Sequence, residues 1–238
     1  QYDRQGNLQG RRRIGVFDLA SNQLVELNVP NNYDCQAESW SPDGTFLVVL
    51  CAQGNRIHNF TIALLSIPDG ELTLLLHDPD ETGESGGYEQ ARLSPDGRWL
   101  AFYRIRARGP ELVDGFYVLD MTCASDPSSC QDHVFRMPVE RVVGQYGKCA
   151  IGWTPDGHLT RAIDNQIEIF DLPSGLRMRI LPIDETGGHI TRMEWSPDGE
   201  WVAVLKAYEA IIMLSPVNGG EPIIFDLWAP DPFWVTVP

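Results

Sequence analysis

A run of acidic and hydroxyl side chains between residues 78 and 89 has the pattern of a metal-binding loop. It reads Asp78-Pro-Asp-Glu-Thr-Gly-Glu-Ser-Gly-Gly-Tyr-Glu89, with oxygen-bearing side chains at positions 1, 3, 5, 7 and 12 and glycine at position 6. Calcium prefers about six to eight oxygen ligands, and the glycine permits the sharp turn that such loops need. The spacing predicts a candidate calcium site with the ligands Asp78, Asp80, Thr82, Glu84 and Glu89.

The same run can also be interpreted as a solvated acidic turn. Thr82 is a weaker ligand than a carboxylate, and Ser85 stands where calcium loops carry an apolar anchor. Asp184-Glu-Thr-Gly-Gly-His189 repeats the start of the run without the full ligand set. Asp-Glu-Thr-Gly can therefore serve as a turn alone, and both interpretations stay open. Gly83-Glu-Ser-Gly-Gly87 also matches the nucleophile-elbow pattern, but no helix is predicted after Ser85, so we interpret the match as chance.

Four of the five cysteines are placed to form two disulfides. Cys35 and Cys51 fall opposite one another if the hairpin between them carries a bulge, and Cys123 and Cys130 bracket a short insertion; Cys149 is left over. Two disulfides indicate an oxidising compartment, hence a periplasmic, secreted or cell-surface protein. The alternative is a cytosolic protein with buried free thiols.

One short phrase recurs four times and indicates which elements position these residues. Its Pro-Asp-Gly cores are Pro42-Asp43-Gly44, Pro95-Asp96-Gly97, Pro155-Asp156-Gly157 and Pro197-Asp198-Gly199, each preceded by Ser or Thr. Ser, Pro and Gly suit successive positions of a type I turn, and Gly takes the left-handed conformation that ends a bulged hairpin loop. Each phrase therefore predicts a turn between two antiparallel strands.

The copies repeat at roughly the length of a four-stranded propeller blade, allowing for insertions. We predict an all-β propeller that forms one domain over 1–238, with blades near 33–78, 88–137, 146–182 and 189–228. A fifth, composite blade would combine 1–30 with 231–238, which closes the ring and protects its edges. A six- or seven-bladed propeller that is truncated at both ends is the alternative. Trp40, Trp153 and Trp195, which precede three of the turns, are expected to pack between blades.

The Trp-Ser-Pro-Asp-Gly phrase followed by a β-rich run resembles the WD40-like repeat of TolB-type propellers, which also occurs in propellers of prolyl-oligopeptidase-like enzymes. The resemblance covers nearly the whole chain. It implies the propeller fold and, for TolB-like domains, contact with protein partners. It says little about chemistry, because many functions share this scaffold.

Composition and loop positions suggest a binding module. The formal net charge is −15, which disfavours nucleic acid, and no apolar stretch is long enough to span a membrane. A rim of aromatic and histidine side chains is expected on one face, for protein binding: Tyr88, Tyr146, His189, Tyr208 and Trp228. We predict a non-catalytic scaffold of an extracytoplasmic complex. The alternatives are a lyase or hydrolase with Asp78, Asp80 and His189 at the channel mouth, and the regulatory propeller of a prolyl-oligopeptidase-like peptidase.

Overall fold

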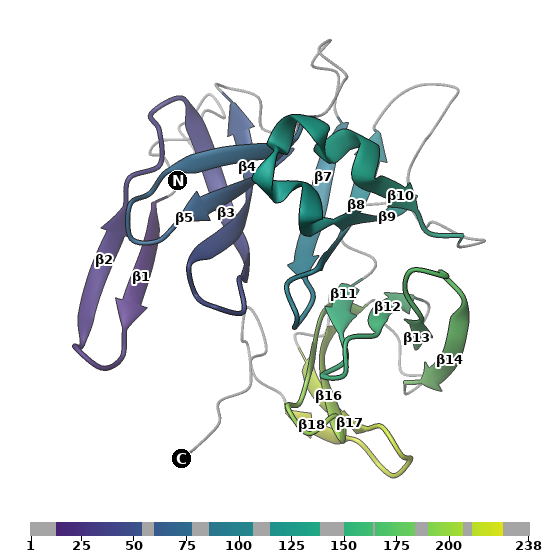
Figure 1. Cartoon of the computed structure of the whole chain (residues 1–238). Coiled ribbons are helices and arrows are strands. Elements are labelled where there is room, and N and C mark those ends of the chain that lie inside the picture. The colour runs from purple at the N-terminus through teal and green to yellow at the C-terminus, as the bar shows by residue number, and fades with distance from the viewer. Residues whose placement is uncertain are drawn as a thin grey trace, which may run out of the picture.

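The computed structural model describes residues 13–53, 60–77, 86–106, 115–138, 150–163, 165–183, 190–206 and 211–225. These ranges contain one two-stranded and four four-stranded antiparallel sheets (Figure 1). We number them as blades along the chain. Blade 1 contains β1 (Ile14–Asp18) and β2 (Gln23–Leu27), and blade 2 contains β3 (Tyr33–Trp40), β4 (Phe46–Gln53), β5 (Phe60–Ser66) and β6 (Leu72–Leu76).

The other three blades repeat the plan of blade 2. Blade 3 contains β7 (Gly86–Leu93), β8 (Trp99–Arg106), β9 (Gly115–Asp120) and β10 (Val134–Arg136). Blade 4 contains β11 (Ala150–Trp153), β12 (Leu159–Ile163), β13 (Gln166–Phe170) and β14 (Arg177–Pro182). Blade 5 contains β15 (Ile190–Trp195), β16 (Trp201–Lys206), β17 (Ile211–Pro216) and β18 (Ile223–Phe225). In each, strands adjacent in sequence pair with each other.

The repeated phrase forms the turn between the first two strands of each four-stranded blade. In blade 2 the amide of Gly44 donates to the carbonyl of Ser41 over 3.0 Å, and the other three turns repeat this bond at 2.9 Å. Gly44 has a φ of 71°, a conformation that glycine adopts without steric cost. The side chain of Asp43 accepts from the amide of Thr45 over 3.1 Å. The turn chemistry of the sequence is thus the chemistry that the structure uses.

Consecutive blades pack face to face through apolar side chains. Separate buried clusters join blades 1 and 2, blades 2 and 3, blades 3 and 4, and blades 4 and 5. The fold is therefore an all-β propeller of four-stranded antiparallel blades, as the repeat predicts. Residues 1–12 and 226–238, which include the inner strands of the predicted composite blade, lie outside the described residues. Within the described ranges, no helix has the length and apolar composition that a membrane crossing requires.

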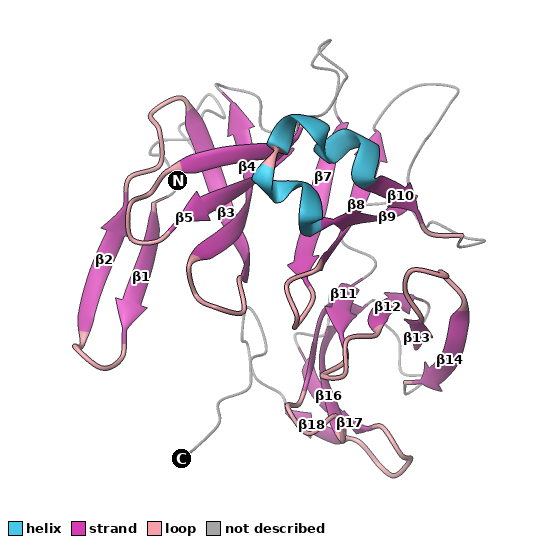
Figure 2. Ribbon diagram, viewed as in Figure 1, coloured by secondary structure: helices cyan, strands magenta, loops and turns pink. Residues whose placement is uncertain are grey.

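Both predicted disulfides are present. Cys35 lies opposite Cys51 across a hairpin with a bulge between Ala37 and Ser39, and their sulfurs are 2.01 Å apart. Cys123 and Cys130 are joined over 2.05 Å. The insertion that they close differs from the all-β expectation, because it folds into two 3₁₀ helices, η1 (Met121–Ser125) and η2 (Pro127–His133) (Figure 2). The side chain of Asp120 caps η1 by accepting from the amide of Thr122 over 3.1 Å.

The three tryptophans before the turns do not share one environment. Trp153 donates its indole N–H to the carbonyl of Arg92 over 3.0 Å, and Trp195 donates to the hydroxyl of Thr160 over 3.2 Å, each toward the preceding blade. The expected packing between blades is confirmed for these two and wrong for Trp40, which is 51% exposed. Trp40 faces the side of blade 1, which has only its two strands β1 and β2 in the described residues.

Candidate functional site

Most of the site residues predicted from the sequence lie outside the described residues. These are Asp78, Asp80, Thr82 and Glu84 of the candidate calcium site and Tyr146, His189, Tyr208 and Trp228 of the expected rim. Tyr88 and Glu89 are described, at the start of β7. Tyr88 is only 2% exposed, its hydroxyl donates to the carbonyl of His77 over 3.1 Å, and its ring packs edge-on against Phe102. The expected rim role of Tyr88 is therefore corrected to packing between blades 2 and 3.

Glu89 belongs to a group of polar side chains on the first strands of the blades. The amide of Gln36 donates to the carboxylate of Glu38 over 2.7 Å, and Arg92 donates to the carbonyl of Glu38. Burial raises the pKa of Glu89, the Glu38 carboxylate raises it further, and Arg192 lowers it. The two carboxylates therefore interact electrostatically from neighbouring first strands. Among the described residues, however, no group of three His, Cys, Asp or Glu side chains is arranged to hold a metal ion.

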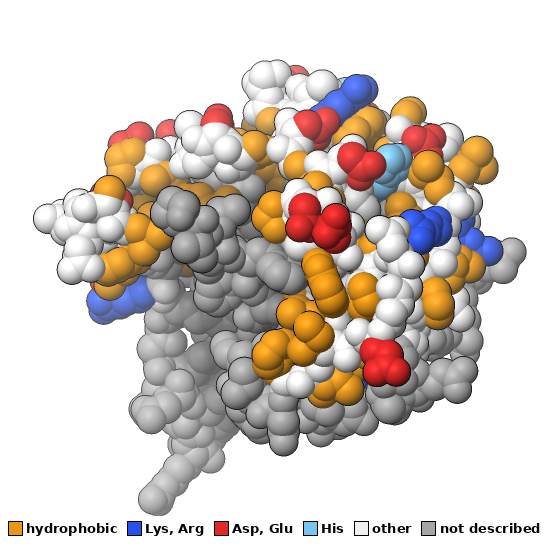
Figure 3. All heavy atoms as spheres, turned by 90° about the horizontal axis from the view of Figure 1, so that it is seen from below, with side chains coloured by type: hydrophobic (Ala, Val, Ile, Leu, Met, Phe, Trp, Pro, Cys, Tyr) orange, Lys and Arg blue, Asp and Glu red, His pale blue; other side chains and the backbone are white. Residues whose placement is uncertain are grey.

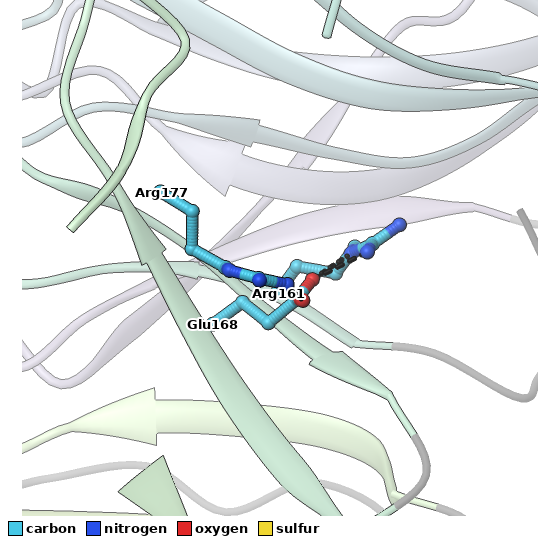
Figure 4. A network of polar contacts seen from close by, with 3 residues as sticks. All are labelled: Arg161, Glu168 and Arg177. Carbon is cyan, nitrogen blue, oxygen red and sulfur yellow. Dashed lines mark hydrogen bonds and ion pairs between the residues drawn. The ribbon is translucent and has the colours of Figure 1, made fainter. Parts of the chain in front are cut away.

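A second charged group lies between blades 3 and 4 (Figure 4). The carboxylate of Glu168 on β13 accepts from Nε of Arg161 over 3.0 Å and from Nη1 of Arg177 over 2.6 Å. Arg161 and Glu168 are buried, and the Arg161 guanidinium lies about 6 Å from the ring centroids of Phe116 and Phe170. These charges compensate one another within the packed sheet. The network therefore attaches the outer strand β14 to its blade.

The outer strand of blade 2 is covered by the next blade. Leu75 and Leu76 of β6 belong to one apolar cluster with Met121, Cys123 and Cys130 of the helical insertion. Leu75 is only 3% exposed as a result. Beside this contact the insertion leaves a hollow of about 530 Å³ against Leu74, Leu75 and His77. We call this arrangement between blades 2 and 3 the covered junction.

The outer strand of blade 4 is not covered in this way. Between blades 4 and 5 lies a groove of about 420 Å³, open to solvent, whose apolar lining is Ile169, Met178, Trp195 and Val217. Met178, on β14, is 58% exposed. We call this arrangement the open junction. Figure 3 shows the molecule from below the view of Figure 1, with acidic side chains next to hydrophobic ones.

Ionisable side chains from two of the repeated turns and from β14 border the groove. Asp156 and His158 come from the turn of blade 4, Asp198 comes from the turn of blade 5, and Arg179 comes from β14. The hydroxyl of Thr154 and then His158 lower the pKa of Asp156, and the hydroxyl of Ser196 lowers the pKa of Asp198. Both carboxylates are therefore ionised at neutral pH. The Arg179 guanidinium donates to the carbonyl of Val217 over 3.1 Å, which holds β14 against blade 5.

Sequence reasoning missed both the ion network and the groove. Arg161 and Glu168 are directly opposite in the register of β12 and β13. The pairing of these two strands could have been predicted from the sequence. The signal was a pair of opposite charges, one in each of two otherwise apolar strands. The sequence carries no such signal for the groove. The groove exists because the connection from blade 5 leaves β14 uncovered, and that is a matter of how the blades pack.

Comparison with known proteins shows the fold of the chain. No protein-family model matches it. An uncharacterized protein of Agrobacterium fabrum is 26% identical over 204 residues, which cover 78% of this chain and 58% of that protein. The crystal structure of TolB from Acinetobacter baumannii matches with a TM-score of 0.63 at 17% identity and covers 89% of this chain. Regucalcin from Agrobacterium tumefaciens, described as a calcium-binding protein, matches with a TM-score of 0.59 at 14% identity and covers 90% of this chain.

The chain spans only part of the proteins that it resembles. It corresponds to 58% of the Agrobacterium fabrum protein, 48% of the TolB chain and 66% of the regucalcin chain. At these identities the similarity to the solved structures shows a shared fold, that of TolB and related β-propellers, and carries no activity with it.

Proposed function

We propose that this propeller is a non-catalytic protein-binding or assembly module that acts outside the cytoplasm. The observation that carries the proposal is a set of large apolar side chains exposed on outer strands of the described blades. Leu24 on β2, Met178 on β14 and Ile224 on β18 are each more than half exposed. Groups of exposed apolar side chains are typical of protein-binding surfaces, and β18 carries three in succession, Ile223, Ile224 and Phe225. The sheets beneath them are well packed, so the framework presents these side chains in a fixed arrangement.

The two disulfides support a location outside the cytoplasm, because reducing conditions inside cells keep most thiols free. Thiol labelling of denatured, unreduced protein tests this part of the proposal. One labelled cysteine, Cys149, is expected among the five. Labelling of Cys123 and Cys130 in freshly isolated protein would contradict it.

Complex formation tests the binding role itself. The purified protein is mixed with the periplasmic or secreted fraction of its source organism, cross-linked and separated by size. We expect a defined complex with a reproducible partner stoichiometry, and carbodiimide cross-links from carboxylates near the exposed outer strands, such as Glu26 on β2 and Glu221 before β18. A protein that elutes alone at every concentration, with no cross-linked partner, would contradict the proposal.

A second candidate function is a calcium-dependent binding or enzymatic role at the first strands. It is favoured by the electrostatic interaction between the Glu38 and Glu89 carboxylates and by the structural similarity to regucalcin, itself described as calcium-binding. The remaining ligands of the site, Asp78, Asp80, Thr82 and Glu84, lie outside the described residues. We expect calcium to raise the melting temperature relative to chelator, and Glu89→Gln to reduce that rise. Equal melting temperatures with calcium and with chelator would exclude this candidate.

A further inference from the structure

The covered and open junctions start from the same local geometry. In blade 3, the amide of Met121 donates to the carbonyl of Arg98 over 2.8 Å at the end of β9. In blade 5, the amide of Val217 donates to the carbonyl of Glu200 over 2.9 Å at the end of β17. Met121 and Val217 are therefore equivalent residues, each the first of the connection from the third to the fourth strand.

The two connections then differ, and this difference creates the groove. Residues 121–133 fold into η1 and η2, whereas residues 217–222 return directly to β18. Leu93 and Met121 pack in one buried cluster with the Cys123–Cys130 disulfide. Their equivalents, Trp195 and Val217, also pack together between blades 4 and 5, but with no insertion above them they line the open groove. The groove is the volume that a helical insertion fills at the covered junction, two junctions earlier, so its natural occupant is a short folded or extended segment with apolar side chains.

The acidic side chains at the border of the groove favour an occupant with positive charge. Asp156 and Asp198 lie on the border, and Glu200 follows Asp198 in the same turn. Among the described residues that line the groove, Arg179 carries the guanidinium, and it already donates to the carbonyl of Val217. Because the formal net charge of the whole chain is −15, a basic partner is also favoured over distance. The groove volume of about 420 Å³ is within the usual range of ligand pockets, about 300–1,000 Å³.

We propose that the open groove binds an exposed segment of a partner protein in which a bulky apolar side chain is adjacent to Lys or Arg. The apolar side chain occupies the space between Met178, Trp195 and Val217, and the cation lies against Asp156 or Asp198. This inference rests on the proposed protein-binding function and names the surface and the partner chemistry for it.

Selection of displayed random peptides on the immobilised protein tests the groove directly. We expect enriched peptides that share a large apolar residue adjacent to Lys or Arg, and whose affinity falls as salt is raised. A synthetic peptide of the consensus should bind Met178→Lys at least about tenfold more weakly than the wild type, because the new cation repels the basic residue of the peptide. The matched control is Leu176→Lys, an exposed residue just before β14 that does not line the groove. Leu176→Lys should bind the peptide normally.

A second variant converts the open junction into a covered one. Residues 217–222 are replaced by the sequence of residues 121–133, which carries its own disulfide. We expect this graft to abolish peptide binding while the disulfide forms and the protein stays folded by circular dichroism. Equal affinity of the peptide for the wild type and Met178→Lys, or a consensus without a basic residue, would overturn the proposal. If the complex with the native partner formed normally with Met178→Lys, the groove would not be the binding surface. If neither the wild type nor any variant formed a complex, the proposed binding function itself would be contradicted.

Discussion

The covered and open junctions attach an outer strand to the propeller in two different ways. At the covered junction, β6 is held by apolar contact with a disulfide-closed helical insertion from the next blade. At the open junction, β14 is held against blade 5 by the bond from Arg179 to Val217, whereas its other face is held toward blade 3 by the ion pair from Arg177 to Glu168. The inner strands pack alike in both places. The difference teaches that the outer strand of a blade is where this fold can expose apolar surface without losing its core.

The largest expected effect comes from removing the ion network that holds β14. Glu168→Ala removes the carboxylate that compensates the buried Arg161 guanidinium, which should lower the free energy of unfolding by about 3–5 kcal/mol. The double variant Arg161→Met with Glu168→Leu should regain most of that loss, because it removes both charges and keeps the volume. Urea unfolding measures both. A single variant as stable as the wild type would show that the network does not hold β14 to its blade.

Truncating the apolar side chain at equivalent outer strands should separate the two junctions. Leu75→Ala removes a buried side chain and should cost about 2–5 kcal/mol. Met178→Ala removes a mostly exposed one and should cost about 0.5 kcal/mol or less. Both are measured by urea unfolding at neutral pH. Equal losses would mean that β14 is covered after all.

Opening the disulfide of the insertion should weaken the covered junction alone. The bond closes a loop with a sequence separation of 7, and loss of such a short loop costs about 2–3 kcal/mol in the chain-entropy account. We expect Cys123→Ala with Cys130→Ala to lower the unfolding free energy by that amount. Peptide binding at the open groove should not change. Hydrogen exchange should rise in β6 and stay constant in β14, and the reverse pattern would contradict the comparison.

The smallest effect concerns the repeated turns, which should respond to pH in the same way at both junctions. Hydroxyl hydrogen bonds, from Ser94 to Asp96 and from Thr154 to Asp156, are the largest cause that lowers the pKa of each carboxyl below the ordinary 3.8. Each carboxyl therefore stabilises the fold fully above pH 3.8 and loses that contribution as pH falls through the folded-state pKa. Asp96→Asn and Asp156→Asn should each flatten the acid decline of the melting temperature to a similar extent. If only one of the two variants changed the acid decline of the melting temperature, the pH response of a turn would depend on whether its junction is covered.

Features that depend on a few adjacent residues could be predicted from the sequence. The Pro-Asp-Gly turns fix the register of the strands that they join, and that register brings Cys35 opposite Cys51. The insertion was expected, but its helices were not, although Asp120 before η1 and Pro127 at the start of η2 are usual helix-start signals. Tyr88 was expected on a loop because the apolar pattern indicates a later start of the strand. In the structure β7 already begins at Gly86, so Tyr88 lies within it.

The amino-acid sequence by itself determined the turns, the strand pairing within each blade and the two disulfides, because each of these depends on neighbours along the chain. Only the tertiary structure decided which surfaces remain uncovered. Trp40, Trp153 and Trp195 occupy the same place in their repeats, yet Trp40 is exposed because burial depends on what the adjacent blade places against it. β6 and β14 differ for the same reason, since the segment that covers an outer strand comes from the following blade.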